Sequence, residues 1–418
     1  MQRVSKYLYL ALLYTLLASL QATVHAQSVD LTDNYNLGYR SHEKSDPYKL
    51  GSFKAGGSVG SAVGYDDNVH ETPDDKRSGA FVQTDAFLWI NSDWERHALN
   101  ISAYGSQSVY PDNNSEDEYY ANIFTYGRLD LPSDVQFELI STYQFDEDPR
   151  GDPRILFNPS KTSVDQEAAV KAFLSKGFGK AAITVRGGVT YSQHEDTTSN
   201  LGLSLQRDDD DSILYDVRLR GSFNFGERLN AYVEGGYNRW DFERETDRNG
   251  IQRGSQGGHV AAGLLFQPNN KISGEIAVGY RHQQFRDPGF SDSGALTLDA
   301  WVTWAVTDRF NLSAVADTRF EEDSIFGQAG TLSRSLTLQA DYRVHDRLRL
   351  FTSGYYLYED NIGSSLDDQT LIATIGFDYE LYSRLVLTGK YEYEYFDAGF
   401  AGGDYDANRV QLGLKLTR

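Results

Sequence analysis

Cysteine is absent from this chain, methionine occurs once and proline only nine times. Without cysteine the chain can form no disulfide and offers a metal no thiolate ligand. Basic residues are also scarce, since 39 Lys and Arg stand against 60 Asp and Glu, a formal net charge of −21. This balance argues against binding nucleic acid or anionic lipid through a broadly basic surface.

Long apolar runs are missing as well, except at the start of the chain. Residues 1–26 combine a basic beginning (Arg3 and Lys6) with a short apolar run and small residues before a cleavage position. This order predicts a secretory signal peptide. No later run is long enough for a membrane-spanning helix.

Tyrosine (28), phenylalanine (22) and glycine (38) are abundant. They recur in segments of alternating polarity, such as 135–139 and 213–219. Strand side chains point to alternate faces, so each segment has one apolar and one polar face. Almost no helical sequence is left to cover these apolar faces, and lipid is the simplest solvent for them. The pattern therefore predicts a closed antiparallel transmembrane β-barrel in the outer membrane.

Short turns and longer acidic loops alternate along the chain. The short turns are 92–96, 132–134, 177–180, 226–228, 268–271, 307–309, 345–347 and 382–384. The longer loops are 66–78, 111–118, 147–163, 195–211, 243–255, 287–293, 321–331, 361–368 and 397–406. Eight turns and nine loops predict about 18 strands, with short periplasmic turns and long extracellular loops. We assign 27–50 to a periplasmic lead-in and 51–418 to the barrel.

Alternation also assigns side chains to faces. The charged residues predicted to line the pore are Glu138, Arg186, Asp216, Arg218, Arg220, Glu234, Glu275, Arg281, Asp317, Arg319, Asp341, Arg343, Lys390, Glu392 and Glu394. The aromatic residues predicted to form interfacial girdles are Trp94, Trp240, Tyr342, Tyr356, Tyr358, Tyr393 and Tyr395. Tyr104 and Tyr126 are further inward rings, suited to weak stacking on sugar faces.

The inward charges have two interpretations. Both signs are interleaved, so they could form a polar pore whose transverse field filters solutes. They could instead pair across neighbouring strands and merely satisfy one another. A barrel of 18 strands is too wide to be filled by its own wall side chains, which favours the pore. A loop or the 27–50 segment could still plug it.

The remaining motifs carry little chemistry. The acidic runs 208–211 and 116–118 lack the spacing and turn glycine of a calcium loop, and we interpret them as solvated loops. His194, His259 and His282 have acids nearby, but no serine lies in a nucleophile setting. We therefore expect no enzymatic activity, no cofactor and no metal.

Three segments near the start are more specific than the periodicity. They are Lys-Leu-Gly-Ser-Phe at 49–53, Gly-Tyr-Asp-Asp-Asn-Val at 64–69 and Ser-Asp-Trp-Glu-Arg-His-Ala-Leu at 92–99. Together they resemble the start of the family called putative beta-barrel porin type 2. The resemblance implies an outer-membrane barrel that often accompanies genes for exopolysaccharide synthesis and export. The final residues, 416–418, lack the terminal aromatic usual in the assembly signal of such barrels.

These observations predict an outer-membrane porin serving as a conduit for exopolysaccharide or capsular polysaccharide; the polysaccharide comes from the resemblance. Its expected partners are outer-membrane lipid, the barrel assembly machinery, a periplasmic polysaccharide export protein and the polysaccharide itself. Two alternatives remain, a general or selective porin for small solutes and a plugged structural or adhesive barrel.

Overall fold

A computed structural model describes residues 47–74, 76–112, 116–148, 163–198, 204–205, 207–247, 250–321, 328–364, 366–399 and 403–418. The predicted signal peptide (1–26), most of the lead-in (27–50) and parts of several predicted loops lie outside these residues. Among the described residues, no helix is long and apolar enough to cross a membrane.

Eighteen long strands alternate with connections in the described part of the chain. They are β2 (Phe53–Asp66), β3 (Gly79–Ser92), β4 (Ala98–Val109), β5 (Glu118–Leu131), β6 (Val135–Asp148), β7 (Ser163–Phe178), β8 (Ala181–His194), β11 (Ser212–Asn224), β12 (Leu229–Phe242), β13 (Ser255–Asn269), β14 (Ile272–Phe285), β15 (Ser293–Thr307), β16 (Phe310–Glu321), β17 (Gly330–His345), β18 (Leu348–Ile362), β19 (Asp367–Tyr382), β20 (Leu385–Asp397) and β21 (Tyr405–Thr417). Three short strands accompany them: β1 (Tyr48–Leu50), β9 (Thr197–Thr198) and β10 (Ser204–Leu205).

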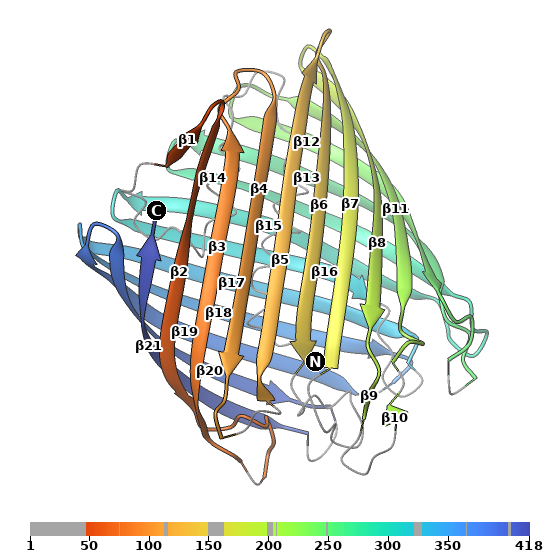
Figure 1. Ribbon diagram of the computed structural model, residues 1–418. Helices are drawn as coiled ribbons and strands as arrows, with labels where there is room; N and C mark the ends of the chain where they lie inside the picture. The colour runs from red at the N-terminus through yellow and green to blue at the C-terminus, as the bar shows by residue number, and fades with distance from the viewer. Residues whose placement is uncertain are drawn as a thin grey trace.

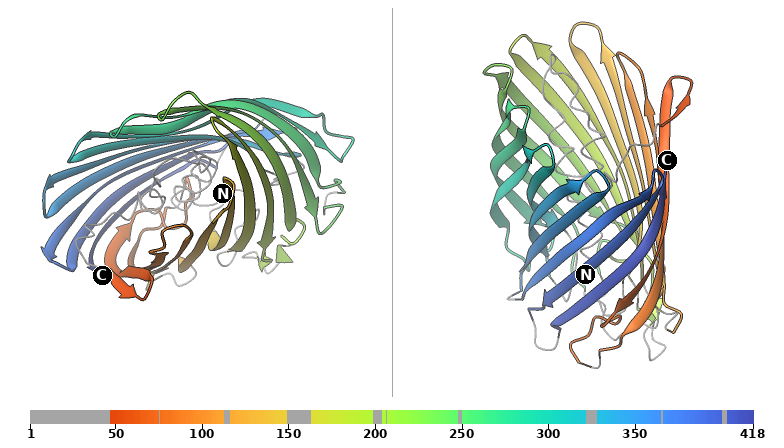
Figure 2. Two further views of the ribbon diagram at one scale, coloured as in Figure 1. Left: turned by 90° about the horizontal axis from the view of Figure 1, so that it is seen from above. Right: turned by 90° about the vertical axis from the view of Figure 1, so that its left-hand side faces the viewer.

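Each long strand pairs antiparallel with its neighbours in the sequence, and the ring closes where β2 pairs with β21. The predicted closed antiparallel β-barrel of 18 strands is therefore confirmed. Closure gives every long strand a partner on both sides, which removes the free edges that lipid does not tolerate. The wall formed by β2–β8 crosses in front of the strongly tilted rear wall (Figure 1). Seen along its axis, the ring is elongated rather than round (Figure 2).

The outward face of the barrel is apolar, as the alternation predicts. Along β14, Ile276, Val278 and Tyr280 are 41–56% exposed, whereas Glu275 and Ala277 between them are 4% and 5% exposed. The same alternation holds in β21, where Val410, Leu412, Leu414 and Leu416 are exposed. Because exposed aliphatic side chains form a continuous outer band, this surface suits contact with lipid.

The turns at one end of the barrel are tight. Ser133 and Asp134 between β5 and β6 both have positive φ (63° and 57°), and Gly179 between β7 and β8 has φ 71°. Such left-handed residues match the twist of paired strands in short hairpins. The nine other connections leave from the opposite end, and all except the four residues between β18 and β19 are longer than any short turn, so the predicted alternation of short turns and long loops is confirmed.

The seam between the first and last barrel strands is reinforced at both ends. Arg409 of β21 reaches the carboxylate of Asp66 at 2.7 Å, and Asn408 donates its backbone N–H to Asp67 at 2.7 Å. At the short-turn end, β1 pairs with the start of β2, and the Arg418 guanidinium lies 3.6 Å from the Tyr48 ring centre. β1 thus extends the sheet beyond the last residues of β21, a strand that the alternation of polarity did not indicate.

The separation of turns and loops onto two ends gives a direct test of orientation. Epitope tags within 195–211 or 321–331, on the long-loop end, are expected to react with antibody on intact cells. Tags after Gly226 or Asp346, in short turns, are expected to react only after the outer membrane is opened. Surface labelling of the short-turn tags would reverse the orientation.

Candidate pore lining

All fifteen charged residues predicted to line the pore lie on the lumen-facing side of the strand alternation. Most of these side chains are buried or half-buried, and Arg343, at the short-turn end of β17, is exposed. They belong to β6, β8, β11, β12, β14, β16, β17 and β20, so they surround much of the lumen.

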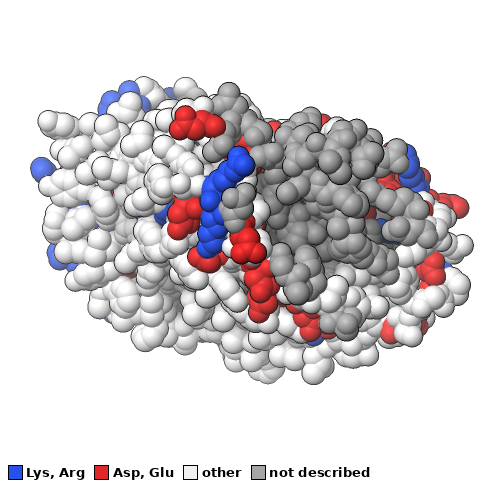
Figure 3. Space-filling view, turned by 90° about the horizontal axis from the view of Figure 1, so that it is seen from below, with Lys and Arg blue, Asp and Glu red and all other residues white. Residues whose placement is uncertain are grey.

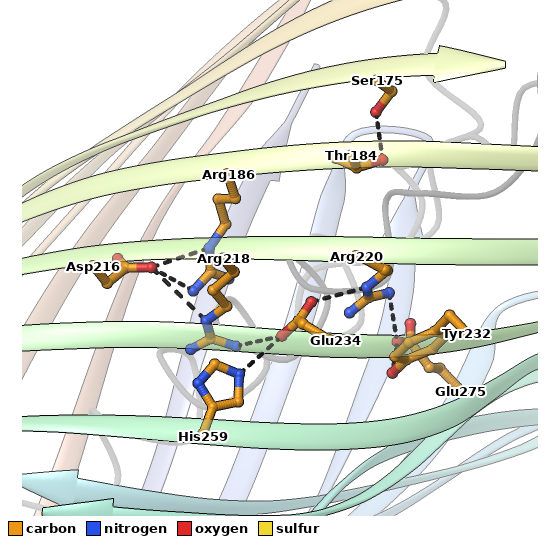
Figure 4. A network of polar contacts seen from close by, with 10 residues as sticks. All are labelled: Ser175, Thr184, Arg186, Asp216, Arg218, Arg220, Tyr232, Glu234, His259 and Glu275. Carbon is orange, nitrogen blue, oxygen red and sulfur yellow. Dashed lines mark hydrogen bonds and ion pairs between the residues drawn. The ribbon is translucent and has the colours of Figure 1, made fainter.

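Eight residues of this wall and of its neighbours form the polar network of Figure 4, and Ser175 and Thr184 form a separate hydrogen-bonded pair beside it. Arg186 contacts Asp216 at 2.7 Å, and Arg218 contacts Glu234 at 3.2 Å. Glu234 also accepts from Arg220 at 2.9 Å. Positive and negative groups therefore alternate from β8 to β12.

The network continues onto the next strands. Arg220 reaches Glu275 of β14 at 3.2 Å, and the Tyr232 hydroxyl donates to the same carboxylate at 2.5 Å. The Arg220 guanidinium also lies 3.7 Å from the Tyr232 ring centre. His259 of β13 lies 3.1 Å from Glu234. Glu234 thus has three cationic or hydrogen-bonding partners and is the centre of the network.

Strand register explains why the acids are needed. Arg186 and Arg218 stand directly opposite each other, as do His259 and Arg281. Like charges in directly opposed positions repel, so Asp216 and Glu234 must lie between the guanidinium groups. Gly236 of β12 stands opposite Arg218 on one side and opposite His259 on the other. A Cβ at Gly236 would lie 2.3 Å from the His259 ring. The absence of a side chain at Gly236 lets Arg218 and His259 fold toward Glu234.

A second group of inward residues lines a cavity of about 280 Å³ against β2–β5 and β17–β21. Arg349 of β18 contacts Asp378 at 3.1 Å and also pairs with Asp341. Lys390 contacts Glu392 at 3.3 Å. Both signs of charge therefore line this wall too, beside hydroxyl and amide groups.

Aromatic rings share this cavity with the charged groups. Tyr104 and Tyr120 face inward from β4 and β5 with their ring centres 5.8 Å apart. Tyr126, expected to be a second stacking ring, is unsuited to that role. It is 2% exposed, packs with Phe124 and Phe173, and donates its hydroxyl to Glu138 at 2.9 Å.

The aromatic girdle requires one correction. Trp240 has the same position in the β12 alternation as Tyr232 and Glu234, so it faces the lumen rather than lipid. The other predicted members lie on the outer side or at a turn. These residues are Trp94, Tyr342, Tyr356, Tyr358, Tyr393 and Tyr395.

The acidic runs are not simply solvated, contrary to our interpretation of the sequence. Asp209 and Asp211 are 2% and 5% exposed, and Glu116 is 2% exposed. Asp210 pairs with Arg253 at 3.3 Å. These runs therefore help to fold the long-loop end, where acidic side chains are visible beside basic ones (Figure 3). Within the described ranges, no group of three His, Cys, Asp or Glu side chains is arranged to hold a metal ion.

Several lumen residues were missed in the sequence. Lys171 of β7 alternates with outward Val170 and Ala172, so the rule used for the other strands could have found it. Arg349 and Asp378 also alternate with apolar neighbours. Their pairing depends on which residues of adjacent strands stand opposite, and alternation alone does not give that register.

Comparison with known proteins agrees with this architecture. The sequence profile of a family described as "Putative beta-barrel porin 2" matches residues 46–418. No curated protein matches the chain.

Among solved structures, a BenF-like porin from Pseudomonas fluorescens Pf-5 is 11% identical, with a TM-score of 0.44, and the match covers 88% of this chain and all (100%) of that one. OccK2 (OpdF) from Pseudomonas aeruginosa is 13% identical, with a TM-score of 0.42 and coverage of 87% and 98%. The siderophore receptor PirA from Acinetobacter baumannii is 7% identical, with a TM-score of 0.40 and coverage of 86% and 80%.

Proposed function

Because the chain belongs to the beta-barrel porin 2 family, and is therefore an outer-membrane β-barrel, we propose that it is a conduit for a secreted exopolysaccharide or capsular polysaccharide. The observation that carries the proposal is the polar lumen wall, in which both signs of charge recur from strand to strand. A hydrated polymer needs many weak polar contacts, so that it can enter the channel and still leave it.

The cavity against β2–β5 and β17–β21 supports this proposal with a specific combination of groups. Tyr104 and Tyr120 offer ring faces, while Arg349, Asp378 and Lys390 offer charges within the same cavity. Aromatic faces and polar groups together suit sugar rings, which have both C–H faces and hydroxyl edges. The choice of a polymer over smaller sugars comes from the resemblance to barrels that accompany exopolysaccharide genes.

Deletion of the gene tests the proposal most directly. The deletion strain is expected to secrete much less polysaccharide and to accumulate it in the periplasm. Complementation with the wild-type gene is expected to restore secretion. Normal secretion by the deletion strain, combined with loss of uptake of small solutes, would instead support the small-solute porin.

A plugged barrel has one observation in its favour. Phe124, Ile140 and Phe173 face the lumen from β5, β6 and β7 and are only 1–3% exposed. This stretch of wall is therefore not open to water. Conductance of the purified protein in planar bilayers separates the two transport functions from a closed barrel.

Arg218 is the arginine best placed to act on permeating ions. Its side chain is 24% exposed, whereas Arg220 is 7% exposed and bound on two sides. Arg218→Ser is expected to shift ion selectivity toward cations, because the lumen loses a positive charge near open water. The reversal potential across a salt gradient measures this shift. Arg334→Ser, which removes an arginine beside Tyr358 on the outer face, should leave the potential unchanged.

A further inference from the structure

The outer face of β12–β14 carries a polar pocket at the long-loop end. It has a volume of about 490 Å³ and is lined by Arg239, Gln256, Gln284, Arg286 and Asp292, among others. Arg239 follows the outward positions Val233 and Tyr237 along β12, which are 65% and 47% exposed. The pocket therefore opens to the outside of the barrel, at the level where the lipid headgroups of the outer leaflet lie.

One carboxylate organises the two arginines of this pocket. Asp241 accepts from Arg239 at 2.9 Å and also pairs with Arg286 of the neighbouring loop. The Arg239 and Arg286 side chains are 51% and 36% exposed. Two guanidinium groups held side by side by one acid keep further N–H donors directed away from that acid. Such a pair suits a ligand with more negative charge than one carboxylate, above all a phosphate.

The backbone around Arg286 is held in place as well. Its N–H donates to the carbonyl of Gly254 at 3.0 Å. The next residue, Asp287, accepts from the backbone N–H groups of Gln252 at 2.8 Å and Gly289 at 2.7 Å, and these bonds lower the pKa of Asp287. The backbone that carries Arg286 is therefore fixed by hydrogen bonds at Arg286 itself and at the next residue.

An apolar groove lies next to the pocket, toward the middle of the same strands, and extends onto β11 and β15. It has a volume of about 890 Å³, and Val233, Val260, Val278 and Leu296 line it. These four side chains are 56–74% exposed. Gly235 lies at its floor, and a Cβ there would meet only a backbone oxygen at 3.9 Å. The groove is therefore open, apolar and wide enough to receive hydrocarbon chains.

We propose that the pocket and the groove together bind a phosphorylated, acylated glycolipid of the outer leaflet. The phosphate lies against Arg239 and Arg286, the sugar hydroxyls meet Gln256 and Gln284, and the acyl chains occupy the groove over Gly235. The site is local, so it is compatible with the net charge of −21, which opposes only a broadly basic surface. It does not depend on which solute passes through the lumen.

The order of the groups along the strands supports a single lipid rather than two separate ligands. Arg239 lies four positions after Gly235 on β12, which corresponds to about 13 Å at the rise of a strand. This is the scale of a glycolipid headgroup joined to the upper part of its chains. The outward residues Tyr237 and Tyr280, each 47% exposed, lie between the polar and apolar parts, at the depth where aromatic side chains mark the interface.

Native mass spectrometry of the full-length folded barrel in detergent tests the proposal, with diphosphorylated lipid A as the probe. Wild type is expected to bind one lipid A, and the double variant Arg239→Gln, Arg286→Gln to bind it at least ten-fold more weakly. Gly235→Leu, which fills the groove, is expected to weaken binding to a similar extent. Dephosphorylated lipid A should bind wild type about as weakly as the double variant binds the phosphorylated form.

Matched controls keep the test specific. Arg334→Gln removes an arginine from the outer face of β17, and Gly354→Leu adds a side chain to the outer face of β18, where a Cβ meets nothing within 4 Å. Both controls should bind lipid A like wild type, and folding of each variant is checked by heat-modifiable migration. Equal affinity of wild type and the double arginine variant would overturn the proposal. So would equal affinity of wild type for phosphorylated and dephosphorylated lipid.

Discussion

Replacement of Glu234 by alanine is expected to destabilise the barrel by about 3–5 kcal/mol, because it breaks two largely buried ion pairs at once and leaves Arg218 and Arg220 with only their second acids, Asp216 and Glu275. Arg218 and Arg220 both contact this carboxylate, at 3.2 Å and 2.9 Å, and His259 lies 3.1 Å away. The midpoint of denaturant unfolding in micelles measures the loss. The expected loss is large because Glu234 contacts three partners, whereas Asp216 and Glu275 each contact two.

Two further variants show whether charge is the cause. Glu227→Ala, in the exposed turn between β11 and β12, should change stability by no more than about 0.5 kcal/mol. Glu234→Gln keeps a hydrogen-bond acceptor but loses the charge, so its stability should fall between those of wild type and Glu234→Ala. If Glu234→Ala unfolds at the wild-type midpoint, the network contributes nothing measurable to stability.

The second large effect is expected on the lipid face of β17. Leu338 lies near the middle of the strand and is 52% exposed, so Leu338→Arg places a charge near the bilayer midplane at a cost of about 2–4 kcal/mol. Gln339, the next residue, faces the lumen cavity. Gln339→Arg is therefore expected to fold nearly as well as wild type. The measurement is the fraction of folded, heat-modifiable protein in each strain, and equal losses in the two variants would contradict the assignment of faces.

The strand count and the arrangement of turns could be predicted because both are local properties. A strand needs only alternating polarity, and a tight hairpin needs only a few turn residues. Short β1 was missed because three residues are too few to show alternation. Its position depends on the turn at Gly51, where φ is 64°.

The ion pairs between lumen side chains could not be predicted from the sequence, because they depend on the register between neighbouring strands. Alternation assigns Glu275 to the inner face, but it does not show which groups hold the carboxylate there. In the structure Glu275 is 4% exposed and is bound by Arg220 and Tyr232, so reversal would set two positive charges against each other. Trp240 was misassigned for a different reason. It shares the alternation of Glu234, which places it in the lumen, and only its nearness to the strand end suggested a girdle position.

Closure of the ring by β2 and β21 has a consequence for the time course of folding. The other neighbouring long strands are successive along the chain, so their pairing brings together nearby residues. Asp66 and Arg409, in contrast, are 343 residues apart. The entropy lost on closing a loop grows with its length, although slowly. This junction is therefore expected to form last, after the rate-limiting step of folding. Contacts made only at this junction, such as the Asp66–Arg409 pair, should then slow unfolding and leave the rate of folding almost unchanged.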